Sequence, residues 1–189
     1  RALIISQTAG DRLGQAAALV NMGGTQLNKG NYETARDHLA QALLINRFAC
    51  YRPGEATCLN KLAALNKALG QYSVALQLVG AAIAIRRAIE DEPGLAQDLL
   101  LQGAIYLAQE DYKAARDNAG QALEINQRTK NKIEEANTWL ELAVALEGLQ
   151  DIQKARHAYE QAQLLQEALG NQLGVLDAKI GLARTSLAP

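Results

Sequence analysis

Proline and aromatic residues are scarce in this chain, and it has no long hydrophobic run. The sequence contains three prolines and 4% aromatic residues, whereas 49% of its residues are hydrophobic, with Ala and Leu in excess. Ala and Leu are strong helix formers. No apolar stretch reaches the ~18 residues that a membrane-spanning helix needs, and no signal-peptide pattern precedes the first expected helix. This composition predicts an all-α protein that does not enter a membrane.

A dominant charge is also missing. The chain carries 19 basic and 20 acidic residues, for a net charge of −1. A domain that holds nucleic acid by its phosphates usually has a marked basic excess. We therefore expect no nucleic-acid binding by this chain. The acidic residues follow the solvent faces of the expected helices, which predicts solvated surfaces rather than an acidic site.

Residues for metal, disulfide or covalent chemistry are few. Cys50 and Cys58 are the only cysteines, and the two histidines, His38 and His157, are far apart in the sequence. Two cysteines in a chain of this length indicate free thiols in a reducing cytoplasm, with a single disulfide as the alternative. The sequence has no metal-ligand spacing, Gly-rich phosphate loop or Ser-His-acid arrangement. We expect a cytoplasmic protein with no catalytic residues, no metal and no cofactor.

What the sequence does contain is a repeat with a 40-residue period. Its second half is marked by Tyr32, Tyr72, Tyr112 and Ile152, then by Ala35, Ala75, Ala115 and Ala155, and then by Ala42, Ala82, Ala122 and Ala162. The offsets within each copy follow one face of a helix. An upstream segment in each copy has its own apolar stripe with a small residue, which allows the two helices of a hairpin to approach closely. The repeat predicts four helical hairpins.

Turn residues separate these segments. Asn31, Asp111 and Asp151 are predicted N-caps of the second helices, and Gln71 is a poor one. Gln102 stands where the pattern requires an apolar residue. Either its side chain extends into solvent, or the third repeat is locally rotated. A rotated helix would bury Leu101.

The repeat also sets expected boundaries within a single solenoid domain, residues 1–189. Residues 1–13 would end a preceding repeat, 14–53, 54–93, 94–133 and 134–173 would be complete repeats, and 174–189 would form the first helix of a further one. The single helix at each end lacks the polar cap that an isolated solenoid requires. We therefore expect a fragment of a larger multidomain protein, or self-association through the uncapped ends.

One motif resembles the tetratricopeptide repeat, and it consists of Trp139, Leu142, Ala143, Ala155, Tyr159 and Ala162. The usual period of that family is ~34 residues. The longer version is similar to the repeats of kinesin light chains and of polarity adaptors that bind receptor-coupled G proteins. It is also similar to the sensor regions of bacterial regulators such as the maltose-regulon activator. The resemblance implies a right-handed α–α superhelix, with Trp139 in a hairpin core.

In this family the first helices of successive repeats line a concave groove that binds partners. The resemblance therefore implies a set of groove residues, namely Asn21, Asn60, Lys61, Lys67, Leu100, Leu101, Leu107, Asn137 and Glu141. The set is polar and basic at one end, apolar in the middle and acidic at the other end. Three leucines on a nominally exposed face suggest an interaction patch. The alternative is that each residue is an ordinary part of a helix surface.

Two functions are consistent with the sequence. The first is a non-catalytic scaffold that binds an extended or helical protein segment, with acidic residues facing Lys61 and Lys67 and basic residues facing Glu141 and Glu147. The second is an effector-sensing or self-association module of a bacterial signal-dependent transcription regulator. A nucleotide-binding domain or a helix-turn-helix elsewhere in the parent protein would favour the second function.

Overall fold

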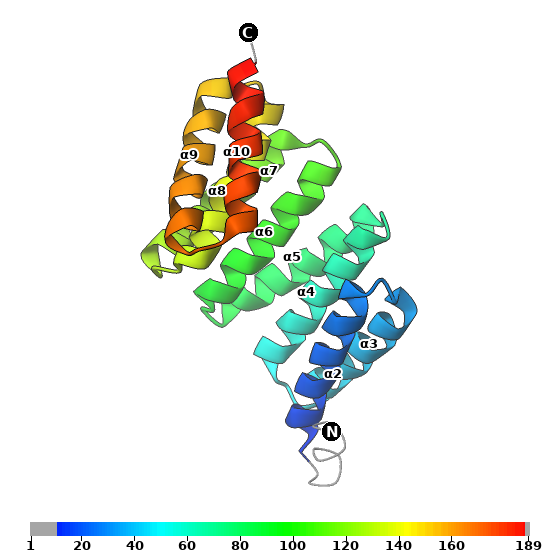
Figure 1. The fold of residues 1–189 in the computed structure, drawn as a ribbon. Coiled ribbons are helices and arrows are strands. Elements are labelled where there is room, and N and C mark those ends of the chain that lie inside the picture. The colour runs from blue at the N-terminus through cyan, green and yellow to red at the C-terminus, as the bar shows by residue number, and fades with distance from the viewer. Residues whose placement is uncertain (1–10, 188–189) are drawn as a thin grey trace. The chain divides into compact units, whose positions relative to one another are not determined.

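The computed structural model describes residues 11–187, which form helices joined by short turns and contain no strand. The helices are α2 (Arg12–Asn28), α3 (Tyr32–Phe48), α4 (Arg52–Ala68), α5 (Tyr72–Ala88), α6 (Glu92–Ala108), α7 (Tyr112–Arg128), α8 (Lys132–Gly148), α9 (Ile152–Ala168) and α10 (Gln172–Leu187). Figure 1 shows them as consecutive hairpins. The all-α prediction is confirmed for these residues. The expected end of a preceding repeat falls mostly on residues 1–10, outside the described range.

The turns explain why helices begin at a constant interval. In each turn the middle residue adopts a positive φ, and these residues are Gly30, Cys50, Gly70, Glu90, Glu110, Lys130, Gln150 and Gly170. The next residue then donates its N–H to a carbonyl of the preceding helix, as when Asn31 donates to the Gln26 carbonyl at 2.9 Å. This bond satisfies a carbonyl that the end of the helix would otherwise leave unpaired.

Side chains cap several of the helix starts. The carboxylates of Asp111 and Asp151 accept from the backbone N–H of Ala114 and Lys154, as predicted. Gln71 makes no side-chain cap bond, also as predicted. The prediction for Asn31 is wrong, because its amide Nδ2 donates to Gln26 Oε1 at 2.8 Å and its side chain does not cap α3.

The chain divides into two compact units, Arg1–Gly94 and Leu95–Pro189, called here the first and second units. The predicted single domain and its repeat boundaries stay a prediction. In the first unit α2 packs on α3, α4 packs on α5, and α3 packs on α4. Gly23 permits the first of these contacts, because a Cβ there would lie 2.7 Å from the Cγ of Leu39. Ala35 and Ala75 are fully buried, which fits their predicted place in the hairpin cores.

The second unit follows the same plan: α7 packs on α8, and α8 packs on α9. The last helix, α10, occupies the place of a further first helix and packs on both α9 and α8. Its core contains Ala143, Leu146, Ala155, Ala158 and Tyr159. Trp139 packs against this core as predicted, and its ring meets the His157 ring edge-on at 6.2 Å between centroids. Gly181 of α10 accommodates the Tyr159 ring, because a Cβ at this glycine would lie 2.3 Å from it.

A buried polar side chain recurs near the end of every second helix, and the sequence analysis did not single it out. The four residues are Asn46, Arg86, Asn126 and Gln166. Each donates to a neighbouring first helix. The Asn46 amide donates to the Cys58 sulfur at 3.4 Å, and the Asn126 amide donates to the Thr138 hydroxyl at 3.0 Å. The sequence signal was a polar residue directly after an apolar helix position in all four repeats.

Glycines provide the space for some of these polar side chains. A Cβ at Gly54 would lie 2.5 Å from the Asn46 Oδ1, and a Cβ at Gly174 would lie 2.4 Å from the Gln166 Cδ. The missing Cβ leaves room for these amide groups beside the first turn of the next first helix. The Asn46 and Asn126 amides link a second helix to the next first helix. Arg86 and Gln166 instead donate to the first helix of their own hairpin.

Candidate functional site

Each unit has a cleft between two successive first helices. The first cleft, between α2 and α4, has a volume of about 230 Å³ and is lined by Leu13, Ala17, Val20, Asn21, Asn46, Tyr51, Pro53, Gly54 and Thr57. The second cleft, between α8 and α10, has a volume of about 290 Å³ and is lined by Leu107, Leu140, Glu141, Val144, Tyr159, Asp177, Ile180 and Arg184. Both clefts therefore lie on the first-helix faces where the sequence analysis expected a groove.

The second cleft combines an apolar wall with acidic side chains. The wall consists of Leu107, Leu140, Val144 and Ile180, which come from α6, α8 and α10. Glu141 is half-buried and Asp177 is exposed, and both line the same space. An apolar cavity with a few charged groups at its edge is the usual arrangement for anchoring one side chain of a partner.

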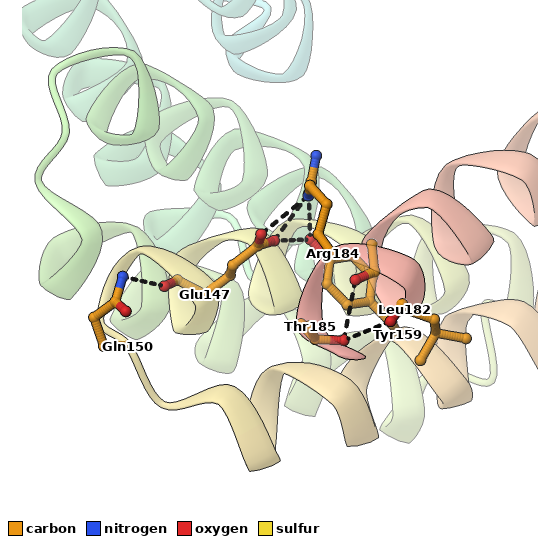
Figure 2. A network of polar contacts seen from close by, with 7 residues as sticks. Glu147, Gln150, Tyr159, Leu182, Arg184 and Thr185 are labelled. Carbon is orange, nitrogen blue, oxygen red and sulfur yellow. Dashed lines mark hydrogen bonds and ion pairs between the residues drawn. The ribbon is translucent and has the colours of Figure 1, made fainter. Parts of the chain in front are cut away.

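A network of polar contacts closes one side of the second cleft (Figure 2). The Arg184 guanidinium donates through Nε and Nη2 to the two carboxylate oxygens of Glu147, at 3.0 and 2.8 Å. The Tyr159 hydroxyl donates to Glu147 Oε2 at 2.7 Å and accepts from Arg184 Nη2 at 3.0 Å. Bidentate pairing of this kind has a defined geometry. The network therefore ties α10 to α8 and α9 at the cleft.

The electrostatics of the network keep Tyr159 protonated. Burial raises the pKa of the Tyr159 hydroxyl well above its ordinary value, and the hydrogen bond to Glu147 raises it further. The hydrogen bond to Glu147 also raises the pKa of Arg184. A tyrosine with a raised pKa stays a neutral donor near neutral pH and is a poor acid or base. The network is therefore suited to holding helices in place rather than to proton transfer.

The first cleft contains no charged side chain among its lining residues. Asn21 is exposed at its edge, while Asn46 is buried and already donates to Cys58. Burial raises the pKa of the Cys58 thiol, and this thiol is not a reactive thiolate. The first cleft therefore offers apolar surface and amide or hydroxyl groups, and it has no counterpart of the Glu147–Arg184 pair.

The structure distributes the predicted groove residues over several environments. Asn21 lines the first cleft, and Leu107 and Glu141 line the second. Asn60, Lys61 and Lys67 are half-buried on α4 outside the lining of the first cleft. Asn137 is half-buried, and its side-chain oxygen accepts from the Gln166 amide at 3.1 Å. The groove assignment of the whole set stays a prediction.

The expected leucine patch is only partly accessible. Leu100 is 7% exposed, which makes it a core residue and removes it from the predicted surface patch. Leu101 and Gln102 are both half-buried, so neither the fully exposed nor the fully buried alternative describes them. Of the three predicted leucines, Leu107 lines the second cleft, and Leu100 and Leu101 line neither of the two clefts. The exposure of a residue at a helix flank depends on its neighbours, which the repeat pattern alone does not specify.

Sequence reasoning missed the pairing that closes the second cleft. The repeat pattern places Glu147 and Arg184 on the inward faces of two first helices, but they are 37 positions apart and no local spacing links them. Tyr159 was recognised as a core residue without a role for its hydroxyl. Asp177 was not singled out. The only available signal was opposite charge on the inward faces of successive first helices.

Residues 11–187 contain no metal cluster and no membrane-spanning helix. No group of three or more His, Cys, Asp or Glu side chains there is arranged to hold a metal ion. No helix in this range combines the length and the hydropathy that a membrane crossing needs. The two clefts and the polar network are therefore the candidate functional features of the described residues.

A family model described as tetratricopeptide repeat matches residues 14–88 and 95–168. Comparison of the sequence with curated proteins returned no match. Solved structures do resemble the chain. Aspartyl phosphate phosphatase F from Bacillus subtilis aligns with a TM-score of 0.85 and 16% identity, over 90% of this chain and 45% of its own. This chain thus spans less than half the length of that protein.

Two further structures bear on the resemblance inferred from the motif. Kinesin light chain TPR-like repeats from Podosopora anserina align with a TM-score of 0.74 and 20% identity, over 89% of this chain and 84% of theirs. A signal transduction ATPase with numerous domains and a tetratricopeptide repeat sensor, from Pyrococcus horikoshii, aligns with a TM-score of 0.81 and 19% identity, over 93% of this chain and 27% of its own. At these identities the likeness concerns the fold, and it confirms the predicted all-α repeat architecture.

Proposed function

Because this chain belongs to the tetratricopeptide-repeat family, whose members generally mediate protein–protein interaction, we propose that it is a non-catalytic scaffold that binds a segment of another protein. The observation that carries the proposal is the second cleft, with its apolar wall beside Glu141 and Asp177. We assign it as the principal contact with the partner. We also propose a cytoplasmic location, which the free thiols Cys50 and Cys58 support.

The size of the second cleft favours an anchoring side chain over a large ligand. Its volume of about 290 Å³ lies at the lower end of the range for small-molecule sites. One Leu, Ile or Phe side chain of a partner segment would contact Leu140, Val144 and Ile180 at once. Burial of such a side chain contributes about 1.5–3 kcal/mol, so the anchor supplies most of the affinity.

The charges of the second cleft define the residue beside the anchor. Asp177 and Glu141 line the cleft, and Arg184 is already paired with Glu147. A Lys or Arg adjacent to the apolar anchor therefore complements this site. The basic end of the partner faces the exposed Asp177 rather than Glu147, which revises the expectation from sequence. Exposed ion pairs contribute only about 0.2–1 kcal/mol each, so they mainly set orientation.

Selection of displayed random peptides on the immobilised 189-residue chain tests the proposal. We expect enriched peptides to share a large apolar residue next to Lys or Arg. Val144→Glu, in the wall of the cleft, should abolish their binding. The matched control, Leu164→Glu, changes an exposed leucine outside both clefts and should retain it. Enrichment of peptides without basic residues, or binding that survives Val144→Glu, would contradict the assignment.

A second candidate function is effector sensing within a signalling regulator. The observation that favours it is the fold likeness to the Pyrococcus protein, which is described as having a tetratricopeptide repeat sensor. In that case a small molecule would occupy one of the clefts. A small-molecule library can be screened for compounds that raise the melting temperature of the chain. Such a compound, together with failure of the peptide selection, would favour this function over the scaffold.

A further inference from the structure

Two of the repeats contain a polar bridge inside the hairpin. Arg86 Nη2 donates to the Thr57 hydroxyl at 2.9 Å, and the Gln166 amide donates to the Asn137 side-chain oxygen at 3.1 Å. Each bridge joins the last turn of a second helix to the first half of the first helix of the same hairpin. Such a bridge requires a long donor side chain on the second helix and a polar side chain on the first.

The first repeat lacks this bridge, and the first cleft lies in its place. The equivalent residues are Asn46, whose side chain is shorter than that of Arg or Gln, and Ala17, which has no polar side-chain group. Both line the first cleft. All of its lining residues come from α2, α3, α4 and the turn before α4, so the cleft opens between helices of the array rather than at an end of it.

The floor of the first cleft offers one hydrogen-bond acceptor. Asn46 is 3% exposed and lines the cleft, so the little surface that it exposes faces this space. Its Nδ2 donates to the Cys58 sulfur at 3.4 Å, and no donor within residues 11–187 bonds its Oδ1. A buried amide oxygen requires a donor. A ligand in the cleft can supply this donor in place of water.

The other polar groups of the first cleft favour a neutral ligand. The Thr57 hydroxyl donates to the Pro53 carbonyl at 3.0 Å and accepts from Arg86, so it is already paired. None of the residues that line this cleft is charged. An ammonium or carboxylate group buried there would therefore have no opposite charge beside it, which is costly. The fitting ligand is neutral and carries a donor for Asn46 Oδ1.

The walls of the first cleft are apolar and partly aromatic. They include Leu13, Ala17, Val20, Tyr51 and Pro53. The Tyr51 ring lies beside Gly54, because a Cβ at this glycine would be 2.6 Å from the ring carbon Cδ1. A second aromatic ring can pack against Tyr51 edge-on or with an offset. The volume of about 230 Å³ is below that of most small-molecule sites, which favours a single side chain.

We propose that the first cleft binds a tyrosine side chain of a protein partner, with the phenol hydroxyl donating to Asn46 Oδ1. Tyrosine is neutral near neutral pH and has an apolar ring with a donor at its tip, which an acceptor at the cleft floor requires. Phenylalanine lacks the donor, and lysine would bury its charge. The proposal adds a contact to the proposed scaffold, and it rests on that function only for the protein origin of the tyrosine.

Binding of p-cresol, the analogue of the tyrosine side chain, tests the first cleft without a partner. In nuclear magnetic resonance spectra of the 189-residue chain we expect saturable shifts of the amide signals of Val20, Asn21 and Gly54. Toluene lacks the hydroxyl and should bind about three- to tenfold more weakly. Equal affinity for the two compounds, or no saturable shift of these signals, would overturn the proposal.

Two variants that fill the first cleft test the site. Ala17→Leu places a larger side chain in the wall at an exposed position and should abolish saturable p-cresol binding. The double variant Ala17→Asn, Asn46→Gln copies the Gln166–Asn137 bridge and should do the same. The matched control, Ala40→Leu, changes an exposed alanine of α3 outside the cleft and should bind like the wild type. Undiminished binding in variants with unchanged helix content by circular dichroism would contradict the assignment.

Peptide selection on the Val144→Glu chain tests the origin of the tyrosine, because this variant blocks the second cleft. We expect enriched peptides to contain tyrosine. They should lose binding when this tyrosine is changed to phenylalanine, or when the chain also carries Ala17→Leu. Enrichment of peptides without tyrosine, or no enrichment although p-cresol binds, would overturn the assignment of a partner tyrosine. Failure of the wild-type chain to select second-cleft peptides, with p-cresol binding intact, would contradict only the proposed role of the second cleft.

Discussion

The two clefts lie between equivalent pairs of first helices but have different chemistry. The first cleft, between α2 and α4, is lined by apolar, amide and hydroxyl groups. The second, between α8 and α10, contains Glu141, Asp177 and Arg184 and is closed by the Glu147–Arg184 pair. Their backbones follow the same pattern of helices and turns. The comparison teaches that the repeat places a cleft between successive first helices, while the residues that vary between repeats give each cleft its chemistry.

One variable core position accounts for much of this difference. Leu39 in the first unit and Tyr159 in the second occupy the same place in the repeat, and both are buried. Leu39 packs under Gly23 of its own hairpin. Tyr159 instead reaches the next first helix, where Gly181 leaves room for its ring. In the first unit the position equivalent to Gly181 is occupied by Lys61. A longer side chain therefore connects two hairpins at the second cleft.

Removing these two side chains should have the largest effects. Tyr159→Ala should lower the free energy of unfolding by about 3–5 kcal/mol, because it leaves a large cavity. Leu39→Ala should cost about 2–5 kcal/mol, and it should not loosen α10. Chemical denaturation gives the two free energies, and hydrogen exchange reports the protection of α10. Equal loss of α10 protection in both variants would contradict the role given to Tyr159.

Alanine at two neighbouring glycines of α2 should have opposite effects. Gly23→Ala places a Cβ against Leu39, which should cost about 1–3 kcal/mol. Gly24→Ala meets nothing within 4 Å and should stabilise the helix by about 0.5–1 kcal/mol. Gly181→Ala in the second unit should resemble Gly23→Ala, because its Cβ meets the Tyr159 ring. Thermal denaturation measures all three. Destabilisation by Gly24→Ala would show that α2 has an unrecognised contact.

Alkaline pH should destabilise the second unit through Tyr159. The pKa of Tyr159 is raised in the folded protein, so the unfolded chain releases this proton first. The stabilisation is complete below the ordinary tyrosine pKa of about 10 and is lost as the pH rises above it. The free energy of unfolding, measured from about pH 8 to about pH 11, should fall less steeply with pH for Tyr159→Phe than for the wild type. If the free energy of unfolding falls equally steeply with pH in both proteins, Tyr159 is not the cause of the alkaline destabilisation.

Reversing the basic charges of the first unit should have the smallest effect. Lys61→Glu with Lys67→Glu should weaken binding of a partner with an acidic end by about 0.2–1 kcal/mol per ion pair, and the loss should shrink at high salt. Arg36→Glu, on the exposed surface of α3, is the matched control. Affinity measured at two ionic strengths provides the test. An equal loss in the control would indicate a general charge effect rather than a groove contact.

The helix caps were largely predictable from sequence, and the residues that depart from the prediction do so because of their immediate neighbours. The caps at Asp111 and Asp151 depend on a donor three residues away. Asn31 had the same potential, but the Gln26 side chain competes for it. The burial of Leu100 could not be predicted, because a residue at the edge of a helical stripe is covered or exposed according to the neighbouring helices.

The sequence by itself determined the helices, the turns and the small residues at their contacts, because each depends on side chains within a few positions of one another. Only the tertiary structure decided that Glu147, Tyr159 and Arg184 meet, since they are 12 to 37 positions apart and come from three helices. Contacts of that kind depend on how far apart packed helices are held. That distance is set by the size of the side chains between them, such as Tyr159 against Gly181.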